Sequence, residues 1–462
     1  GRMSALWASS EAEAATLGRA SAAFSAMGIS IDTRTLKPGD LFIALKGDAR
    51  DGHEFVKAAF DAKASAALVS HTPDGVKGPL LTVGHVQRGL EDLARAARAR
   101  SHAKIIAVTG SAGKTTTKEM LRLAFGALGN THASAASYNN HWGVPLSLAS
   151  MPRETAFGVF EVGMNHFGEL RNLVSFVRPH VALVTTIAPA HLEFFGNCEA
   201  IADAKSEIFE GILPGGTALI PADSEYAARL MTRAKQAGVS RAMSFGTKGK
   251  DARLIGFQET EDGMKVRSEI LGRPVDFRVG APGAHIAGNA VGALLSVAVL
   301  EGDVLNAAAA LSHFAALKGR GARFKVKAGT GSAEIIDESY NANPASMAAA
   351  LALLGSARAK RRIAVLGDML EMGSNGPAHH ADLAAPIEAA RVDSVYLNGP
   401  QMRSLWETLS TSRRGAYAQT SAENAPLIAG ALQDGDVVLV KGSLGSRMAA
   451  IIDALKARGL AD

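Results

Sequence analysis

Residues 105–117 read Ile105-Ile106-Ala107-Val108-Thr109-Gly110-Ser111-Ala112-Gly113-Lys114-Thr115-Thr116-Thr117, an apolar run that ends in a glycine-rich turn. The β-branched run predicts a buried strand, and the residues from Lys114 onward predict a helix. Glycines let backbone N–H groups turn inward around phosphate oxygens, and the N-terminus of the following helix adds partial positive charge. The stretch therefore predicts a nucleotide phosphate-binding loop. The alternative is a plain glycine turn between a strand and a helix.

Two side chains of this loop have distinct predicted roles. Lys114 is expected to contact the outer phosphates, and the Thr115 hydroxyl is expected to reach Mg²⁺. The general phosphate-loop pattern requires a glycine at position 108, where this chain has Val108. The loop therefore matches a shorter variant, Thr-Gly-x-x-Gly-Lys-Thr-Thr.

Composition limits the classes of protein that this chain can belong to. Its 462 residues suggest about three domains. The 49 Lys and Arg exceed the 44 Asp and Glu by only five, and no basic block carries interleaved aromatics, so no nucleic-acid partner is expected. The single cysteine, Cys198, excludes an internal disulfide and favours a reducing compartment such as the cytoplasm. Residues 1–22 lack a continuous apolar run, so no secretory signal is expected.

Residues 279–300 carry no charged side chain and are long enough to span a bilayer. They contain Pro282, His285, Asn289 and several glycines, which a membrane span seldom combines. We therefore expect a loop followed by a buried helix, and no membrane span.

Alternating strand and helix patterns predict an α/β protein with three domains. Residues 1–100 form a small N-terminal domain, residues 101–317 a central domain with a mainly parallel sheet, and residues 318–462 a Rossmann-like domain. No G-x-G-x-x-G follows the first strand of the third domain, so NAD is not inferred. Predicted strands cover residues 41–45, 66–69, 80–83, 105–109, 157–161, 181–186, 217–220, 334–337, 363–366, 394–397 and 437–440, with a β-hairpin within 241–279.

Ligands of parallel sheets bind beyond the carboxyl ends of the strands, where Glu161 and His191 follow predicted strands and Lys205 lies on the next helix. Glu161 and His191 could complete a Mg²⁺ site beside the phosphates. The alternatives are a capping carboxylate and a hydrogen-bonded loop histidine.

Two further positions allow two interpretations each, and a third segment has one. Arg34, in Asp32-Thr33-Arg34, could bind a phosphate or lie in a surface turn. Asn289 could contact a purine edge or cap a helix. Gly319-Arg320-Gly321 could be a hinge that carries Arg320 to the phosphates.

Together these motifs are similar to those of the Mur ligases, the amide-forming enzymes of peptidoglycan precursor synthesis. The similarity covers all three predicted domains in order. The segments that carry it are residues 32–34, 37–42, 109–119, 138–145, 161–166, 191–196, 204–209, 339–344 and 366–373.

The resemblance implies a domain for the UDP end of a substrate, an ATPase domain, and a domain that binds the incoming amine and closes over ATP. ATP would phosphorylate the terminal carboxylate of UDP-N-acetylmuramoyl-tripeptide, and the amine of D-alanyl-D-alanine would attack the acyl phosphate. Tyr340-Asn341-Ala342-Asn343-Pro344 favours this pair of substrates, because sister ligases differ there. Two Mg²⁺ ions, a CO₂-carbamylated Lys205 and a monomeric state are also expected.

The resemblance assigns roles to residues at matching positions. The catalytic residues would be Lys114, Lys205, His191 and Arg320. ATP would contact Gly110, Ser111, Ala112, Gly113, Lys114, Thr115, Thr116, Asn289, Arg320 and Glu338. The other substrates would contact Thr33, Arg34, Asp51, Gly52, His53, Asn139, Asn140, Tyr340, Asn341 and Asn343. Mg²⁺ would be held by Thr115, Glu161, His191 and Lys205.

This chain departs from the family pattern at four positions. Thr33 stands where Ser is usual, Ala112 where Asn is common, Glu338 where Asp is usual, and Ser206 where Gly is common. Two other functions compete with the ligase. One is a related ligase, such as a folate polyglutamylating enzyme, and the other is a P-loop ATPase or motor that needs no amine acceptor.

Overall fold

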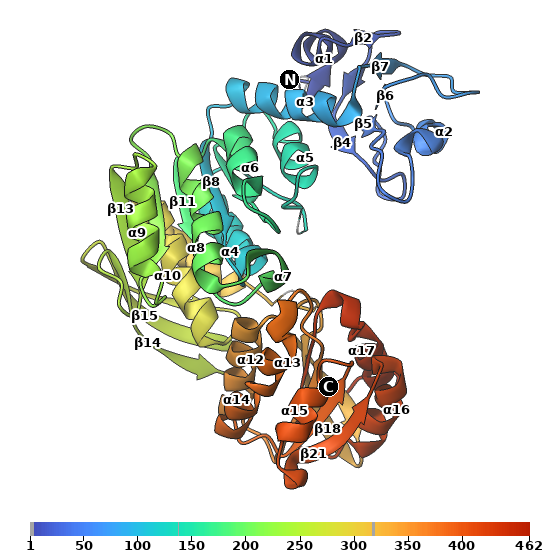
Figure 1. Ribbon diagram of the computed structural model, residues 1–462. Coiled ribbons are helices and arrows are strands. Elements are labelled where there is room, and N and C mark those ends of the chain that lie inside the picture. The colour runs from blue at the N-terminus through green and yellow to red at the C-terminus, as the bar shows by residue number, and fades with distance from the viewer. Residues whose placement is uncertain (1–3, 137, 317–318) are drawn as a thin grey trace.

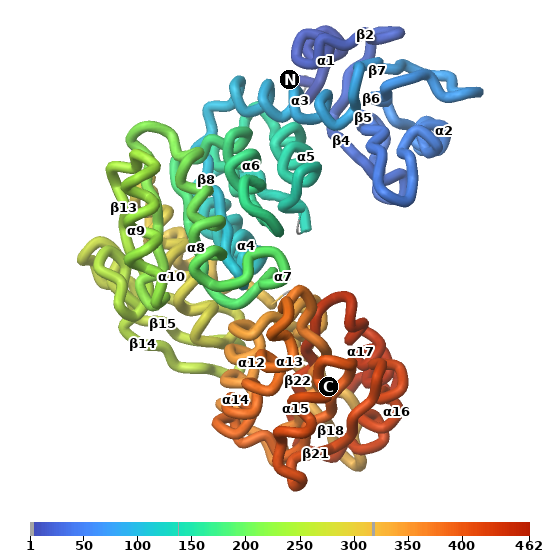
Figure 2. Tube along the Cα trace, in the orientation of Figure 1, coloured from blue at the N-terminus to red at the C-terminus, as the bar shows by residue number. Residues whose placement is uncertain are grey.

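The structure is a computed structural model that describes residues 4–136, 138–316 and 319–462. Three α/β units follow one another along the chain, and the central unit lies between the other two (Figures 1 and 2). Each unit has its own main sheet, so the predicted three-domain α/β fold is confirmed. The predicted boundary between residues 317 and 318 lies outside the described residues.

The N-terminal unit is built on a five-stranded sheet in the order β2-β7-β6-β5-β4, with only β2 antiparallel to its neighbour. Every residue of β5 and β6 is buried, as expected for parallel strands covered on both faces. The elements are β1 (Trp7–Ala8), α1 (Ser9–Thr16), β2 (Arg19–Ala20), β3 (Ser25–Ala26), β4 (Gly28–Ser30), β5 (Asp40–Ile43), η1 (Gly52–Phe55), α2 (Val56–Asp61), β6 (Ala66–Val69), β7 (Leu80–Thr82) and α3 (Val86–Arg100).

Helix α3 joins this unit to the central one. Its apolar face, which includes Leu90 and Leu93, is fully buried. On the same helix, the Arg98 guanidinium donates to the carbonyl oxygens of Val177 and Arg178, each at 2.7 Å. Apolar and polar contacts therefore both hold the first unit against the second.

The central unit has a nine-stranded sheet in the order β16-β15-β14-β13-β12-β11-β8-β10-β9. In this sheet order, neighbouring strands from β9 across to β14 are parallel to one another. Beyond β14, strands β15 and β16 continue the sheet with antiparallel pairing. The elements are β8 (Lys104–Thr109), α4 (Lys114–Gly126), β9 (Thr131–Ala133), α5 (Gly143–Ala149), β10 (Phe157–Glu161), α6 (Glu169–Val177), β11 (Val181–Val184), α7 (Leu192–Phe195), α8 (Cys198–Lys205), η2 (Ser206–Gly211), β12 (Thr217–Pro221), α9 (Ala227–Gln236), β13 (Arg241–Gly246), β14 (Ala252–Thr260), β15 (Gly263–Ile270), β16 (Arg273–Val279), α10 (Ala284–Val299), α11 (Val304–Ala310) and η3 (Leu311–His313).

Strand β8 contributes to two cores, because successive side chains of a strand point to opposite faces of the sheet. Ile105 and Ala107 belong to the core that includes α6, and Ile106 and Val108 belong to the core that includes α4 and α10. This placement fixes the C-terminal end of β8, and hence the glycine-rich loop, between the ends of β11 and β10.

The uncharged segment at residues 279–300 folds as predicted, into a loop followed by the largely buried helix α10. In the described part of the chain, no helix combines the length and the apolar character needed to cross a membrane.

The C-terminal unit has a six-stranded sheet in the order β17-β18-β22-β19-β20-β21, in which only β17 is antiparallel to its neighbour. Strands β17 and β21 were not predicted from the sequence. The elements are β17 (Ala322–Ala328), β18 (Gly331–Glu338), α12 (Pro344–Ser356), β19 (Arg361–Gly367), η4 (Gly373–Asn375), α13 (Gly376–Ala381), α14 (Ala384–Ala389), β20 (Ser394–Asn398), α15 (Arg403–Thr408), η5 (Thr411–Arg413), β21 (Arg414–Ala418), α16 (Ser421–Ala431), β22 (Asp436–Lys441), η6 (Leu444–Ser446) and α17 (Ala449–Lys456).

Ile106→Ala tests the two-sided burial of β8. The fully buried Ile106 side chain packs in the core of α4 and α10. Its truncation should lower the free energy of unfolding by about 2–5 kcal/mol, measured by chemical denaturation. The matched control is Ile255→Ala on β14, where the side chain is 44% exposed and the change should stay within about 0.5 kcal/mol. Equal losses in the two variants would contradict the assignment.

Candidate functional site

The glycine-rich loop is held in a narrow space between β8 and α4. Gly110 has φ +156°, and a Cβ atom there would lie 1.7 Å from the Thr185 hydroxyl. Gly113 has φ +80°, and a Cβ atom there would lie 2.8 Å from the Asn289 amide nitrogen. Both glycines are therefore required by close neighbours as well as by backbone conformation.

Three successive carbonyl oxygens of this loop, at residues 110–112, are each bonded to a side-chain donor. They accept from Lys114 Nζ at 3.1 Å, Asn343 Nδ2 at 2.7 Å and Thr185 Oγ1 at 2.6 Å. A carbonyl oxygen that already accepts a hydrogen bond repels an incoming anion less strongly. The backbone N–H groups and the start of α4 then dominate the local field, which favours phosphate.

A cavity of about 860 Å³ lies over the loop, within the size range of small-molecule sites. It is lined by residues of the central and C-terminal units. Among them are Ser111, Ala112, Gly113, Lys114, Thr115, Thr116, Asn139, Glu161, His191, Asn289, Arg320, Glu338, Tyr340, Asn341, Asn343 and Lys441. The structure thus gathers most of the sequence-predicted site residues around one cavity.

Glu161 and Thr115 form the polar centre of this cavity. Glu161 ends β10 opposite Val108 of β8 and is buried. The Thr115 hydroxyl lies 2.9 Å and 3.0 Å from the two Glu161 carboxylate oxygens, and Asn139 Nδ2 donates to the same carboxylate at 2.8 Å. A carboxylate and a hydroxyl beside a phosphate loop are oxygen ligands of the kind that Mg²⁺ prefers.

The predicted metal ligands do not form a complete protein site by themselves. Among the described residues, no group of three or more His, Cys, Asp or Glu side chains is placed to hold a metal ion. Of the predicted ligands, Glu161 and His191 are of these types, so a metal here would also need phosphate oxygens or a modified Lys205. Phosphate oxygens could complete such a site, because Thr115 and Glu161 lie beside the phosphate-binding loop.

Lys114 projects from the first turn of α4 into the cavity. Burial lowers its pKa, the Glu161 carboxylate raises it, and the Arg320 guanidinium lowers it further. Arg320 comes from the Gly319-Arg320-Gly321 segment, so the C-terminal unit contributes a cation beside the loop.

Lys205 ends α8 and is almost fully buried, although it does not line the cavity. Burial lowers its pKa well below the ordinary value, and the nearby Lys114 charge lowers it further. Both effects make the amine of Lys205 easier to deprotonate than that of a surface lysine.

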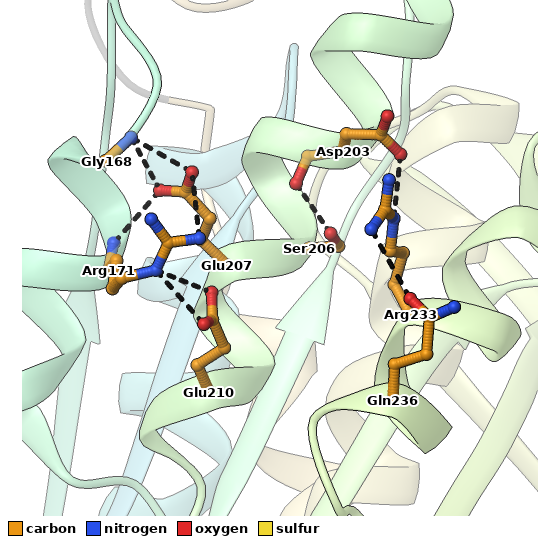
Figure 3. Close-up of polar contacts among 8 residues, drawn as sticks. All are labelled: Gly168, Arg171, Asp203, Ser206, Glu207, Glu210, Arg233 and Gln236. Atoms are coloured by element: carbon orange, nitrogen blue, oxygen red, sulfur yellow. Dashed lines mark hydrogen bonds and ion pairs between the residues drawn. The ribbon is translucent and has the colours of Figure 1, made fainter.

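Two carboxylates flank Lys205 in the chain, Asp203 on α8 and Glu207 on η2, and both bind neighbouring helices (Figure 3). Glu207 is buried and accepts from the backbone N–H groups of Gly168 at 2.9 Å and Arg171 at 3.1 Å, which caps the start of α6. Asp203 accepts from Arg233 of α9 at 3.0 Å. These contacts on two sides fix the position of Lys205.

The C-terminal unit adds a second group of charges to the cavity. The Arg320 guanidinium lies 4.0 Å from the centre of the Tyr340 ring. Lys441, buried at the end of β22, donates to the Asn341 carbonyl oxygen at 2.8 Å and lies 3.5 Å from the Glu338 carboxylate. Burial lowers the Lys441 pKa, and Glu338 opposes that shift. Lys441 was not predicted as a site residue; the available signal was a charged residue directly after the apolar run at residues 437–440.

Two predicted substrate residues have structural partners of their own. Asn343 caps α12 by accepting from the Ser346 N–H at 2.9 Å, in addition to its bond with the loop. Asn140 does not line the cavity and accepts from the Gly143 N–H at 2.8 Å. Their contact with substrate stays a prediction.

His191 follows β11 and faces the C-terminal unit. Its backbone has φ +52°, and its Nδ1 is hydrogen-bonded to the Glu371 carboxylate. This bond holds the pKa of Glu371 below its usual range. Glu371 lies in the segment at residues 366–373 that carries the family resemblance, but no role was predicted for it.

The predicted UDP-binding residues lie in the N-terminal unit, away from the cavity lining. Asp51 accepts from the His53 backbone N–H at 3.0 Å and from its ring Nδ1 at 2.6 Å. The His53 ring stacks on His71 with centroids 4.0 Å apart. Arg34 is exposed and paired with Asp32 at 2.8 Å. Thr33 and Gly52 flank these groups in the chain.

Three family models match consecutive parts of the chain. The Mur ligase family catalytic domain matches residues 26–119, the Mur ligase middle domain residues 108–297, and the Mur ligase glutamate ligase domain residues 322–444. Together they reach into all three structural units.

Curated relatives match nearly the full length. UDP-N-acetylmuramoyl-tripeptide--D-alanyl-D-alanine ligase of Rickettsia prowazekii is 33% identical over 92% of this chain and 94% of its own. The ligase of the same name from Escherichia coli is 34% identical over 93% of this chain and 94% of its own. Among solved structures, MurF from Acinetobacter baumannii superposes with a TM-score of 0.85 at 29% identity, covering 98% of this chain and 99% of that one.

Gly113→Ala tests the close approach between the loop and Asn289. The variant should weaken ATP binding about tenfold or more, measured by titration calorimetry, because the new methyl group must displace the Asn289 amide. Gly238→Ala is the matched control, since Gly238 has φ +82° and an added Cβ atom there would meet nothing within 4 Å. If both variants bind ATP like the unaltered protein, the close approach does not control the site.

Proposed function

Because the chain belongs to the Mur ligase family, we propose that it is an ATP-dependent ligase that joins D-alanyl-D-alanine to UDP-N-acetylmuramoyl-tripeptide. The relatives that carry this activity in their names match more than nine-tenths of the chain. The products would be the pentapeptide precursor of peptidoglycan, ADP and phosphate.

The observation that best supports this proposal is the cavity between the central and C-terminal units. It joins the phosphate loop of the central unit to charged and amide groups of the C-terminal unit. A nucleotide bound by the central unit and an amine bound by the C-terminal unit would meet in this cavity. A P-loop ATPase or motor would have no need for an amine-binding unit at the phosphates.

The reaction follows from the poor reactivity of a carboxylate toward amines. The γ-phosphoryl group passes from ATP to the terminal carboxylate of the tripeptide, which gives an acyl phosphate and ADP. The amine of D-alanyl-D-alanine then attacks the acyl carbon, the amide C–N bond forms, the C–O bond to phosphate breaks, and the amine loses a proton. Positioning and charge neutralisation supply most of the rate in such transfers.

We assign charge neutralisation to the cations around the loop. Lys114 would contact the transferred phosphoryl group, and Arg320 and Lys441 would approach it from the C-terminal unit. Thr115 and Glu161 would hold Mg²⁺, which supplies further neutralisation of the phosphate oxygens when bound.

We propose that Lys205 is carbamylated and that, with His191, it would hold a second Mg²⁺. A neutral amine is the form that adds to CO₂, with loss of a proton, and the depressed pKa of Lys205 favours that form. The product carries a negative charge, so it would attract the neighbouring Lys114 cation instead of repelling it. A carbamate would also provide the oxygen ligands that an unmodified lysine lacks.

The other substrate contacts are proposed from the family pattern. Thr33, Arg34 and the Asp51-Gly52-His53 turn would bind the UDP end. Asn139, Asn140, Tyr340, Asn341 and Asn343 would contact the peptide substrates, while Asn289 and Glu338 would contact ATP. We further propose that the chain acts as a monomer in the cytoplasm, where Cys198 stays reduced.

An assay with ATP, Mg²⁺, UDP-N-acetylmuramoyl-tripeptide and D-alanyl-D-alanine tests the function directly. We expect the pentapeptide product by mass spectrometry and phosphate release that depends on the dipeptide. Lys114→Ala should abolish both. Phosphate release at the same rate without the dipeptide would instead support an ATPase.

Lys205→Ala tests the carbamate. The variant should be inactive, because it lacks the anion that would hold the second metal, and short carboxylic acids added to the assay should restore part of the activity. Lys235→Ala, at an exposed lysine on α9, serves as the control and should be fully active. An active Lys205→Ala enzyme that does not respond to carboxylic acids would contradict the proposed modification.

A further inference from the structure

The contact between α7 and the segment at residues 371–373 joins two units at the edge of the cavity. We propose that Glu371 is a positioning residue that orients the His191 ring only when the central and C-terminal units are packed together. This inference rests on the proposed ligase function, in which His191 lies beside the reacting phosphate.

Glu371 binds the His191 loop at two points. Its side-chain carboxylate is hydrogen-bonded to His191 Nδ1, and its backbone carbonyl oxygen accepts from the Glu193 N–H at 3.1 Å. Glu371 follows β19 of the C-terminal sheet, whereas the loop follows β11 of the central sheet. In Figure 1, α7 lies on the side of the central unit that faces the C-terminal unit. Both bonds therefore cross between units.

The backbone on both sides of this contact has an uncommon conformation. His191 has φ +52° and Glu371 has φ +61°, in the left-handed region that non-glycine residues rarely adopt. Such conformations persist where the surroundings hold them, and they concentrate at functional sites. Here His191 and Glu371 bind each other across the two units, so the backbone conformation of both residues depends on how the units pack.

Apolar contacts support the same arrangement. Leu192 and Phe195 of α7 belong to one contiguous core with Met369 and Met372 of the C-terminal unit. The Phe194 ring packs against His166, with centroids 4.4 Å apart. The loop therefore has little freedom to turn while the units are in contact.

The bond to Nδ1 determines how the His191 ring can act. A neutral imidazole that donates Nδ1–H to a carboxylate carries its lone pair on Nε2. A histidine that binds a metal almost always donates its other ring N–H to a carboxylate, a backbone carbonyl or water, which fixes its tautomer and ring orientation. His191 lines the cavity, so Glu371 would hold the ring in the tautomer that presents Nε2 as a ligand.

Separation of the two units would break both bonds to Glu371. His191 would then lose its orienting carboxylate while ATP could still bind the phosphate loop. The acyl phosphate would therefore form efficiently only after closure, when water is excluded and the amine-binding unit is in place. The Glu371 side chain thereby couples domain closure to the orientation of His191.

Glu371→Ala and Glu371→Gln test the proposal, with Glu407→Ala as the matched control. Glu407 is exposed on α15 and pairs with Arg403 at 3.3 Å within that helix. Glu371→Ala should lower kcat roughly 10- to 100-fold with little change in the KM for ATP. Glu371→Gln should recover most of the rate, because its amide oxygen still accepts from Nδ1–H, and Glu407→Ala should match the unaltered enzyme.

Two measurements separate positioning from a general loss of stability. A double-mutant cycle with His191→Ala should be strongly non-additive, because Glu371 acts through His191. Amide hydrogen exchange without nucleotide or metal should be faster at residues 191–196 in Glu371→Ala, with the α4 and β8 amides unchanged.

The inference would be overturned by an unchanged kcat in Glu371→Ala, by additive effects with His191→Ala, or by unchanged exchange at residues 191–196. Failure of the proposed function has a different signature, since the unaltered enzyme would then form no dipeptide-dependent product. The exchange experiment still measures the Glu371–His191 contact in that case.

Discussion

The arrangement of donors around the glycine-rich loop is the constraint on which the site depends. Residues 110–112 each direct a carbonyl oxygen to a side-chain donor: Lys114 from α4, Thr185 from the end of β11, and Asn343 from the C-terminal unit. The donors come from three separate parts of the fold. All three loop carbonyl oxygens therefore have donors only when those parts are assembled.

Burial of charge is the second feature that unites the site. Lys205, Lys441 and Glu161 are all nearly inaccessible to water. Burial lowers the pKa of each of the two lysines; Lys114 lowers that of Lys205 further, whereas Glu338 opposes the shift at Lys441. In such surroundings, fixed charges interact more strongly than in water. Phosphoryl transfer gains from this environment because its barrier is mainly one of charge and position.

Several local features could be predicted from the sequence because they depend on near neighbours in the chain. The strand before Gly110, the helix after Lys114, and the buried helix α10 are examples, since periodicity and glycine placement specify them. The ends of parallel strands also marked Glu161 and His191 as candidates. Lys441 and Glu371 were not found, because their partners lie about a hundred or more residues away. The edge strands β17 and β21 carry weaker patterns and were missed for that reason.

By itself, the sequence determined the fold class, the phosphate loop and the resemblance to Mur ligases. Each of these can be recognised in short stretches of sequence, where the residue types determine the local backbone structure. Only the tertiary structure decided which cations meet at the loop, that Lys205 is buried beside Lys114, and that Glu371 reaches His191 from another unit. Those contacts depend on how three sheets pack against one another. The pattern of neighbouring residues does not specify that packing, since it results from the apolar surfaces that the units bury together.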